Sequence, residues 1–365
     1  MSASSSSGSP TAKPPTTVTP RSSTTPSYPN PTVSSDPRFV AARHILSNLS
    51  THLPGAPPPA DRCEDAVSLF SVLLQECMTK HCGSDDHASE SPLSARIHVA
   101  LVQYEYGHAI LRRADLAREA DDSGGGGPES ADADQALAVD QMKQAASIYE
   151  SYLDSSDVPS AKFHPYAEHA RCQLPRCLVG IGDAHLHSGR HGDATAAYLR
   201  AVPLREKAAR DEGLGAGEKL KNMRLSAEAH ALVADALLAA PPGADVTVSG
   251  GEDGDRDDGG GNKLLVAAAE RIDYARGYYE QARKNLQDAV FFMGEVLSES
   301  NVDLGSEKSD ICHLATIMMA VGNTLADIDE EGQGKGTTAS SSSARAKHGG
   351  NTSGGERSKK KHKRK

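Results

Sequence analysis

The sequence predicts an all-α protein, a right-handed array of paired helices, and three observations point to this class. Apolar residues recur at the period of an amphipathic helix over most of residues 38–330. In several of these segments a large apolar or aromatic residue is followed directly by Gly or Ala, at equivalent places. Aromatic residues make up 4% of the chain and there is no tryptophan, which suits helices packed closely through small side chains.

The clearest repeat lies between Pro175 and Arg205. Its residues follow the spacing of a tetratricopeptide repeat (TPR), with Leu178, Ile181, Gly182 and His185 in the first helix and Ala194, Tyr198 and Ala201 in the second. Gly182 and Ala194 are small, so we expect the two helices to approach closely where they cross. Gly189 and Gly192 separate the two halves and predict the turn between them.

The same spacing predicts about four TPR-like repeats and a capping helix within residues 37–330. The second and fourth repeats would be interrupted between their helices by insertions at residues 119–135 and 241–262. Residues 1–36 are rich in Ser, Thr and Pro and are expected to be a disordered tail. A transit peptide is the alternative for this tail, although its prolines and its single pair of basic residues argue against a targeting helix. Residues 331–365 are expected to be a disordered linker and basic tail.

Charge is distributed unevenly along the chain. The formal net charge is −10, yet the last nine residues hold seven Lys or Arg and no acid, which leaves −17 on the rest. A short basic run of this kind is typical of a nuclear localisation signal, with a solubilising or nucleic-acid-binding tail as the alternative. Its residues are Lys359, Lys360, Lys361, Lys363, Arg364 and Lys365.

Motifs of catalysis and cofactor binding are missing from the sequence. It contains no G-x-S-x-G, phosphate-binding P-loop or H-E-x-x-H motif, and its six cysteines form no C-x-x-C pair. We therefore expect no enzymatic activity, no cofactor, no metal and no small-molecule substrate. No apolar run approaches the ~18 residues that span a bilayer, so no membrane association is expected.

Acidic residues mark the candidate binding surface. In a TPR array the first helices of the repeats line a groove, and His108, Asp183 and Asp235 occupy equivalent positions on three of them. Together with Glu105 and Glu228 they predict an anionic groove for a basic partner, the alternative being an ordinary solvated helix surface. A second, mobile set of acids is expected in the insertions, namely Asp121, Asp122, Glu252, Asp253, Asp255, Asp257 and Asp258.

The order of parts resembles the interrupted-TPR histone chaperones (SHNi-TPR) related to nuclear autoantigenic sperm protein. The similar stretches are AVSLFSVLLQECMTKHCG, RIHVALVQYEYGHAILRRA, LAVDQMKQAASIYESYL and the central repeat, and the resemblance covers roughly residues 38–330. It implies a protein that binds core histones H3 and H4, with linker histone as a further candidate. It also implies escort of histones for nuclear import and for nucleosome and chromatin assembly, a nuclear location with a cytoplasmic pool, and no direct sequence-specific binding of nucleic acid.

Two other kinds of TPR protein remain as alternatives. A co-chaperone that holds the acidic C-terminal peptide of a heat-shock chaperone needs Lys, Arg and Asn on its first helices. Here Glu105, Asp183 and Asp235 take such positions. A scaffold that binds a peptide or apolar helix of another protein is the third interpretation, because a repeat fold does not fix the function.

Overall fold

The structure of the protein is a computed structural model that describes residues 32–49, 57–82, 92–121, 128–154, 166–211, 213–249, 263–299 and 308–339. After a short 3-10 helix at Thr32–Ser35, the helices are α1 (Pro37–Ser47), α2 (Pro59–Cys82), α3 (Pro92–Asp121), α4 (Pro128–Asp154), α5 (Ala167–His187), α6 (His191–Ala209), α7 (Ala216–Ala239), α8 (Arg271–Glu299) and α9 (Lys308–Ala339). Two short strands, β1 (Val246–Ser249) and β2 (Lys263–Val266), lie between α7 and α8.

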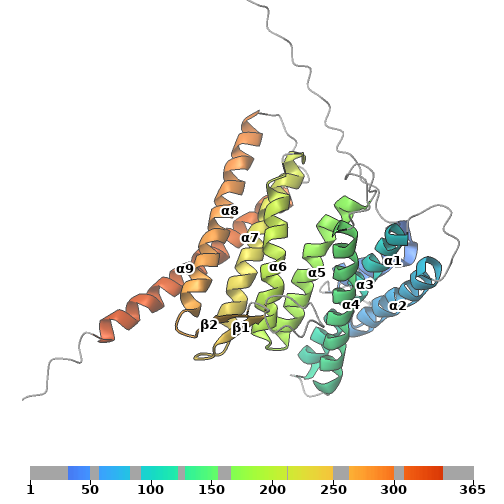
Figure 1. Cartoon of the computed structure of the whole chain (residues 1–365), viewed down its shortest axis with the longest axis horizontal. Helices are drawn as coiled ribbons and strands as arrows, with labels where there is room; N and C mark the ends of the chain where they lie inside the picture. The colour runs from blue at the N-terminus through green and yellow to red at the C-terminus, as the bar shows by residue number, and fades with distance from the viewer. Residues whose placement is uncertain are drawn as a thin grey trace, which may run out of the picture.

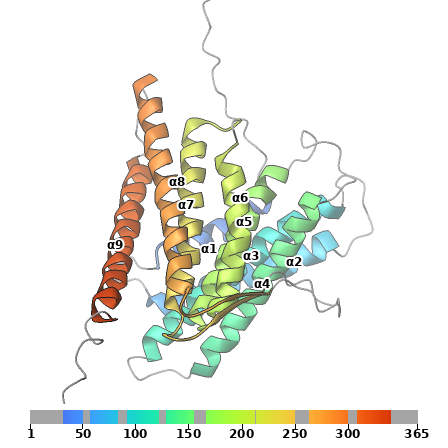
Figure 2. The same ribbon diagram turned by 60° about the vertical axis from the view of Figure 1, so that its left-hand side comes forward.

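The helices form an array in which each packs mainly on the next helix of the chain. Figure 1 shows them side by side in chain order, with α1 and α2 at one end and α9 at the other. In the turned view α9 again forms one edge, with α8 next to it (Figure 2). The hairpins α1–α2, α3–α4, α5–α6 and α7–α8 match the expected repeats, and α9 packs on α8 and α7 as a last helix. The all-α helical repeat architecture is therefore confirmed.

Small residues allow the close helix crossings that the sequence predicts. A Cβ atom on Gly182 of α5 would lie 2.6 Å from Cδ1 and 2.8 Å from Cζ of Tyr198 on α6. In the preceding repeat, a Cβ on Gly107 of α3 would lie 2.9 Å from the carbonyl oxygen of Ala138 on α4. All three distances are shorter than ordinary van der Waals contacts, which are ~3.5–4.0 Å between carbon atoms, so each crossing requires glycine.

The first insertion is shorter than the sequence suggests. Residues 119–121 extend α3 and residues 128–135 begin α4, so most of the range 119–135 is helical. Ala131 and Ala133 favour helix, and Pro128 suits a first helical position. Gln135 is buried, and its side chain donates a hydrogen bond to the carbonyl oxygen of Ala184 on α5. The expected boundaries were wrong because this long-range contact makes the start of α4 part of the core.

The second insertion begins and ends in a β-ribbon that the sequence analysis missed. β1 and β2 are antiparallel, with Val246 opposite Val266 and Ser249 opposite Lys263. Val246, Val248 and Val266 are buried in the same apolar core as helices α6–α9. Residues 241–249 therefore belong to the packed domain, and residues 250–262 lie outside the described part.

Both ends of the packed domain extend beyond their expected limits. Val33 in the 3-10 helix is buried, and Asp36 caps α1 by accepting a hydrogen bond of 2.8 Å from the backbone nitrogen of Arg38. At the other end, α9 continues to Ala339 through residues expected to be linker. Within the described part of the chain, no helix is long and apolar enough to cross a membrane.

Candidate binding surface on the first helices

Helices α3, α5 and α7 carry His108, Asp183 and Asp235 at equivalent positions, and we call the surface around these residues the first-helix face. On α5, the Asp183 carboxylate accepts a hydrogen bond of 2.6 Å from the hydroxyl of Tyr198 on α6. Asp183 is half-buried, and this burial raises its pKa, while the Tyr198 hydrogen bond opposes the shift. The carboxylate is thus held in a fixed position and partly removed from water.

Asp235 repeats this arrangement in the next hairpin. Its carboxylate on α7 accepts a hydrogen bond from the hydroxyl of Tyr279 on α8. The residue is more exposed than Asp183, yet the surrounding helices still raise its pKa, with the Tyr279 hydrogen bond again opposing. In both pairs the hydrogen-bond donor is a neutral hydroxyl, and among the described residues no cation forms an ion pair with either carboxylate. The two negative charges are therefore oriented but not neutralised.

Glu105 does not lie on a solvent-facing groove, contrary to the expectation. It is 4% exposed, and Nε of Arg43 on α1 lies 3.4 Å from its Oε1. Burial raises the pKa of its carboxyl group, and Arg43 opposes this shift. The sequence pattern could not show this, because the burial depends on how α1 packs against α3.

His108 occupies the position of Asp183 but does not extend the acidic row. Its ring stacks on Tyr104, with centroids 6.4 Å apart, and burial together with Arg176 and Arg112 lowers its pKa to about 4. The residue that corresponds to Tyr198 in this repeat is Met142, which has no hydroxyl group to offer. This repeat therefore presents a neutral imidazole where the next two present carboxylates.

Glu228 is also a weaker candidate than the sequence suggests. Its carboxylate forms an ion pair with Arg224, one turn earlier on α7. This intrahelical partner offsets the charge of Glu228. Of the five predicted residues, only Asp183 and Asp235 present carboxylates without an ion pair in the described part of the chain.

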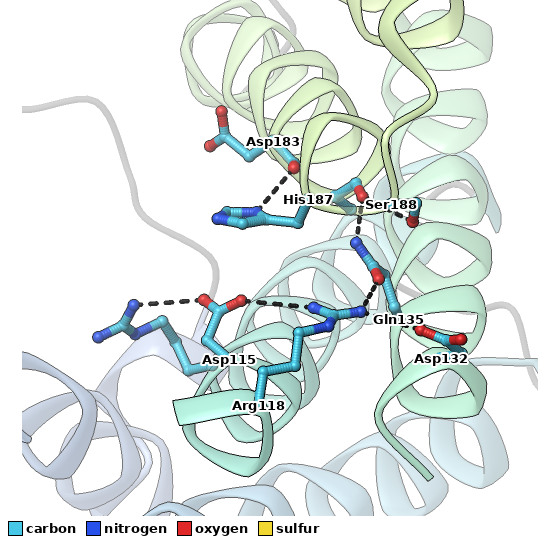
Figure 3. A network of polar contacts seen from close by, with 9 residues as sticks. Asp115, Arg118, Asp132, Gln135, Asp183, His187 and Ser188 are labelled. Atoms are coloured by element: carbon cyan, nitrogen blue, oxygen red, sulfur yellow. Dashed lines mark hydrogen bonds and ion pairs between the residues drawn. The ribbon is translucent and has the colours of Figure 1, made fainter. Parts of the chain in front are cut away.

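A polar network near Asp183 escaped the sequence analysis. The Arg118 guanidinium on α3 donates to Oε1 of Gln135 and lies 3.2 Å from Asp132, while Asp115 lies between Arg112 and Arg118 (Figure 3). Gln135 continues the network to the end of α5, where His187 contacts the carbonyl oxygen of Asp183 at 2.8 Å. Asp115 also raises the pKa of Asp183 by charge repulsion. Asp115 comes two helical turns after His108, so the sequence could have shown that it lies on the same face of α3.

The remaining predicted residues cannot be placed. Asp121 ends α3, but its side chain is not described, and Asp122 and the five acids between Glu252 and Asp258 lie outside the described residues. The six basic residues between Lys359 and Lys365 lie outside them as well.

The described side chains were also compared with the arrangements that bind metal ions. Among them, no group of three or more His, Cys, Asp or Glu residues is arranged to hold a metal ion. Comparison with models of known protein families gave no match, and comparison with curated proteins gave no significant match.

Proposed function

We propose that the protein is a histone chaperone that binds and escorts core histones H3 and H4 without catalysing a reaction. The observation that carries the proposal is the pair of equivalent carboxylates, Asp183 and Asp235, on successive hairpins. Each is oriented by a tyrosine hydroxyl and has no cation as an ion-pair partner in the described part of the chain. A basic segment of a histone has the complementary charge.

Partial burial makes these carboxylates suited to binding. A charge that is already held and partly desolvated loses little freedom when a partner docks, and it attracts a cation more strongly than a fully solvated charge does. The formal charge of −17 outside the basic tail adds long-range attraction for histones. The order of four hairpins followed by a last helix also agrees with the resemblance to interrupted-TPR histone chaperones.

Charge reversal tests the proposal. We expect the double variant Asp183→Lys, Asp235→Lys to raise the dissociation constant for purified H3–H4 at least tenfold at about 150 mM salt, measured by fluorescence anisotropy. The matched control is Asp140→Lys, Asp288→Lys, which makes the same change of net charge at exposed acids on α4 and α8. If the first variant is folded by circular dichroism and binds as tightly as the control, the first-helix face is not the histone site.

We also propose that the protein is nuclear with a cytoplasmic pool, directed by the basic run in residues 357–365. A fluorescent fusion that lacks these residues should lose its nuclear accumulation. Accumulation of the full-length fusion in a plastid or mitochondrion would contradict this and favour the transit-peptide interpretation of residues 1–36.

A co-chaperone that binds an acidic peptide is the second candidate. Two arginines without an ion-pair partner among the described residues, Arg176 and Arg205, lie in the same hairpin as Asp183 and favour it, because binding of carboxylates requires cations. The two functions differ in a competition experiment. In it, an acidic C-terminal peptide of a heat-shock chaperone should outcompete an equal concentration of H3–H4 only if the second candidate is right.

A further inference from the structure

Two arginines of the third hairpin, one buried and one half-buried, have no carboxylate as an ion-pair partner among the described residues. Arg205 on α6 is 7% exposed, and Arg176 on α5 is half-buried. Within the described ranges, neither guanidinium has a carboxylate within ion-pair distance. Arg176 contacts neutral groups, namely Oε1 of Gln173 at 3.1 Å and the face of the Tyr104 ring at 5.1 Å.

The helix register places these two arginines at the same level. The hydrogen bond between Asp183 and Tyr198 fixes the register of the antiparallel helices α5 and α6. Arg176 comes seven residues before Asp183, and Arg205 comes seven residues after Tyr198, so both lie two turns from that bond on the same side. Seven residues of helix correspond to about 10 Å.

The positive charges of this pair are only partly balanced locally. Tyr104 and Glu105 on α3 raise the pKa of Arg176, but Glu105 is already paired with Arg43. Burial lowers the pKa of Arg205, and the neighbouring positive charge of Arg176 lowers it further. Glu228 acts on Arg205 from α7, but it is already paired with Arg224. Burying a charge without a partner costs stability, so the buried cation of Arg205 beside the half-buried cation of Arg176 is a costly arrangement unless an anion joins them. Arginine also presents a planar fork of donors that matches a carboxylate.

We propose that Arg176 and Arg205 bind a carboxylate of the same partner segment whose basic side chain contacts Asp183 and Asp235. The third hairpin then recognises a segment of mixed charge, with its acidic and basic groups about 10 Å apart. That distance corresponds to about three residues of extended chain or seven residues of helix. The inference rests on the proposed function and adds to it the orientation of the bound segment.

The test replaces each arginine with methionine, which keeps the aliphatic length and removes the charge. We expect Arg176→Met and Arg205→Met each to weaken binding of purified H3–H4 about tenfold. Because the pKa of Arg205 is lowered in the folded protein, the melting temperature of free Arg205→Met should stay the same or rise. If Arg205 had a purely structural role, its replacement would lower the melting temperature. If either methionine variant fails to fold, Arg205→Lys keeps the charge without the planar fork and should still weaken binding.

Peptides tiled along H3 and H4 identify the partner carboxylate. In the peptide that binds best, a Glu→Gln or Asp→Asn substitution should weaken binding to the parent protein and have no further effect on the Arg176→Met, Arg205→Met double variant. Such coupling supports the proposal. Full-strength binding of H3–H4 by the folded double variant overturns the arginine site and leaves the proposed function standing. If the parent protein does not bind H3–H4, both the proposed histone-chaperone function and the arginine site for histones are overturned. If it then binds an acidic chaperone peptide instead, the arginines belong to the co-chaperone function.

Discussion

Replacing Gly182 with alanine tests the closest helix crossing of the array. The added Cβ would lie 2.6 Å from Cδ1 and 2.8 Å from Cζ of Tyr198, where carbon atoms normally stay ~3.5–4.0 Å apart. The Tyr198 side chain is fully buried and its hydroxyl is bonded to Asp183, so the ring cannot swing away. Helices α5 and α6 would therefore have to separate by about 1 Å.

Overpacking of this kind costs about 1–3 kcal/mol, and the fixed ring places Gly182→Ala in the upper part of that range. For a domain of this size we expect a fall in melting temperature of roughly 4–12 °C, measured by circular dichroism. The control is Gly277→Ala on α8, where an added Cβ meets no atom within 4 Å. Because glycine weakens a helix interior, the control should gain up to about 1 kcal/mol. A melting temperature of Gly182→Ala equal to that of the parent or the control would refute the crossing.

Two further predictions concern pH, both followed by chemical denaturation. Burial raises the pKa of Asp183 in the folded protein, so the folded state holds its proton more tightly and this contribution to stability is lost as pH rises through the folded pKa. Asp183→Asn keeps a hydrogen-bond acceptor for Tyr198, so it should be more stable than the parent at pH 7 and equally stable below about pH 3.8. The control, Asp140→Asn on the α4 surface, should change the stability little. Burial lowers the pKa of His108 from 6.5 to about 4, so the folded protein disfavours the protonated ring. The free energy of unfolding should therefore be highest above pH 6.5 and fall by up to about 3 kcal/mol as the pH falls to 4. His108→Met should flatten this loss, and an unchanged pH profile would show that the imidazole is solvated.

The helical hairpins could be predicted from the sequence because their determinants are local. The helical period and the Gly or Ala at each crossing lie within one hairpin, and Gly107 and Gly182 occupy the predicted places. The insertion boundaries depend on distant contacts instead. Gln135 belongs to the core because its side chain contacts α5. Val246 belongs to it because this residue packs in the apolar core of helices α6–α9. A four-residue strand whose partner follows thirteen residues later gives a weak sequence signal.

The candidate site was predicted in part, and its hydrogen-bond partners could have been read from the sequence as well. In the two repeats that carry Asp183 and Asp235, the second helix carries Tyr198 and Tyr279, whereas His108 is matched by Met142. The acids therefore recur together with the hydroxyl that orients them. The burial of Glu105 could not be predicted in this way, because it depends on Arg43 and the placement of α1.

The third hairpin combines features that cost stability with features that suit binding. Asp183 is a half-buried carboxylate with a neutral partner, and two turns away Arg176 and Arg205 are cations without carboxylates within ion-pair distance in the described structure. Neutralising Asp183 or Arg205, whose charged forms are disfavoured by burial, should stabilise the free protein, which is the opposite of what a purely structural polar group does. In the second hairpin the residues equivalent to Asp183, Arg176 and Arg205 are His108, Leu101 and Tyr149. Leu101 and Tyr149 belong to the core, and His108 is half-buried and neutral. A trade-off between stability and affinity at Asp183, Arg205 and Asp235 would therefore locate the binding site on the third and fourth hairpins. Substitutions in the second hairpin should instead change stability and affinity in the same direction.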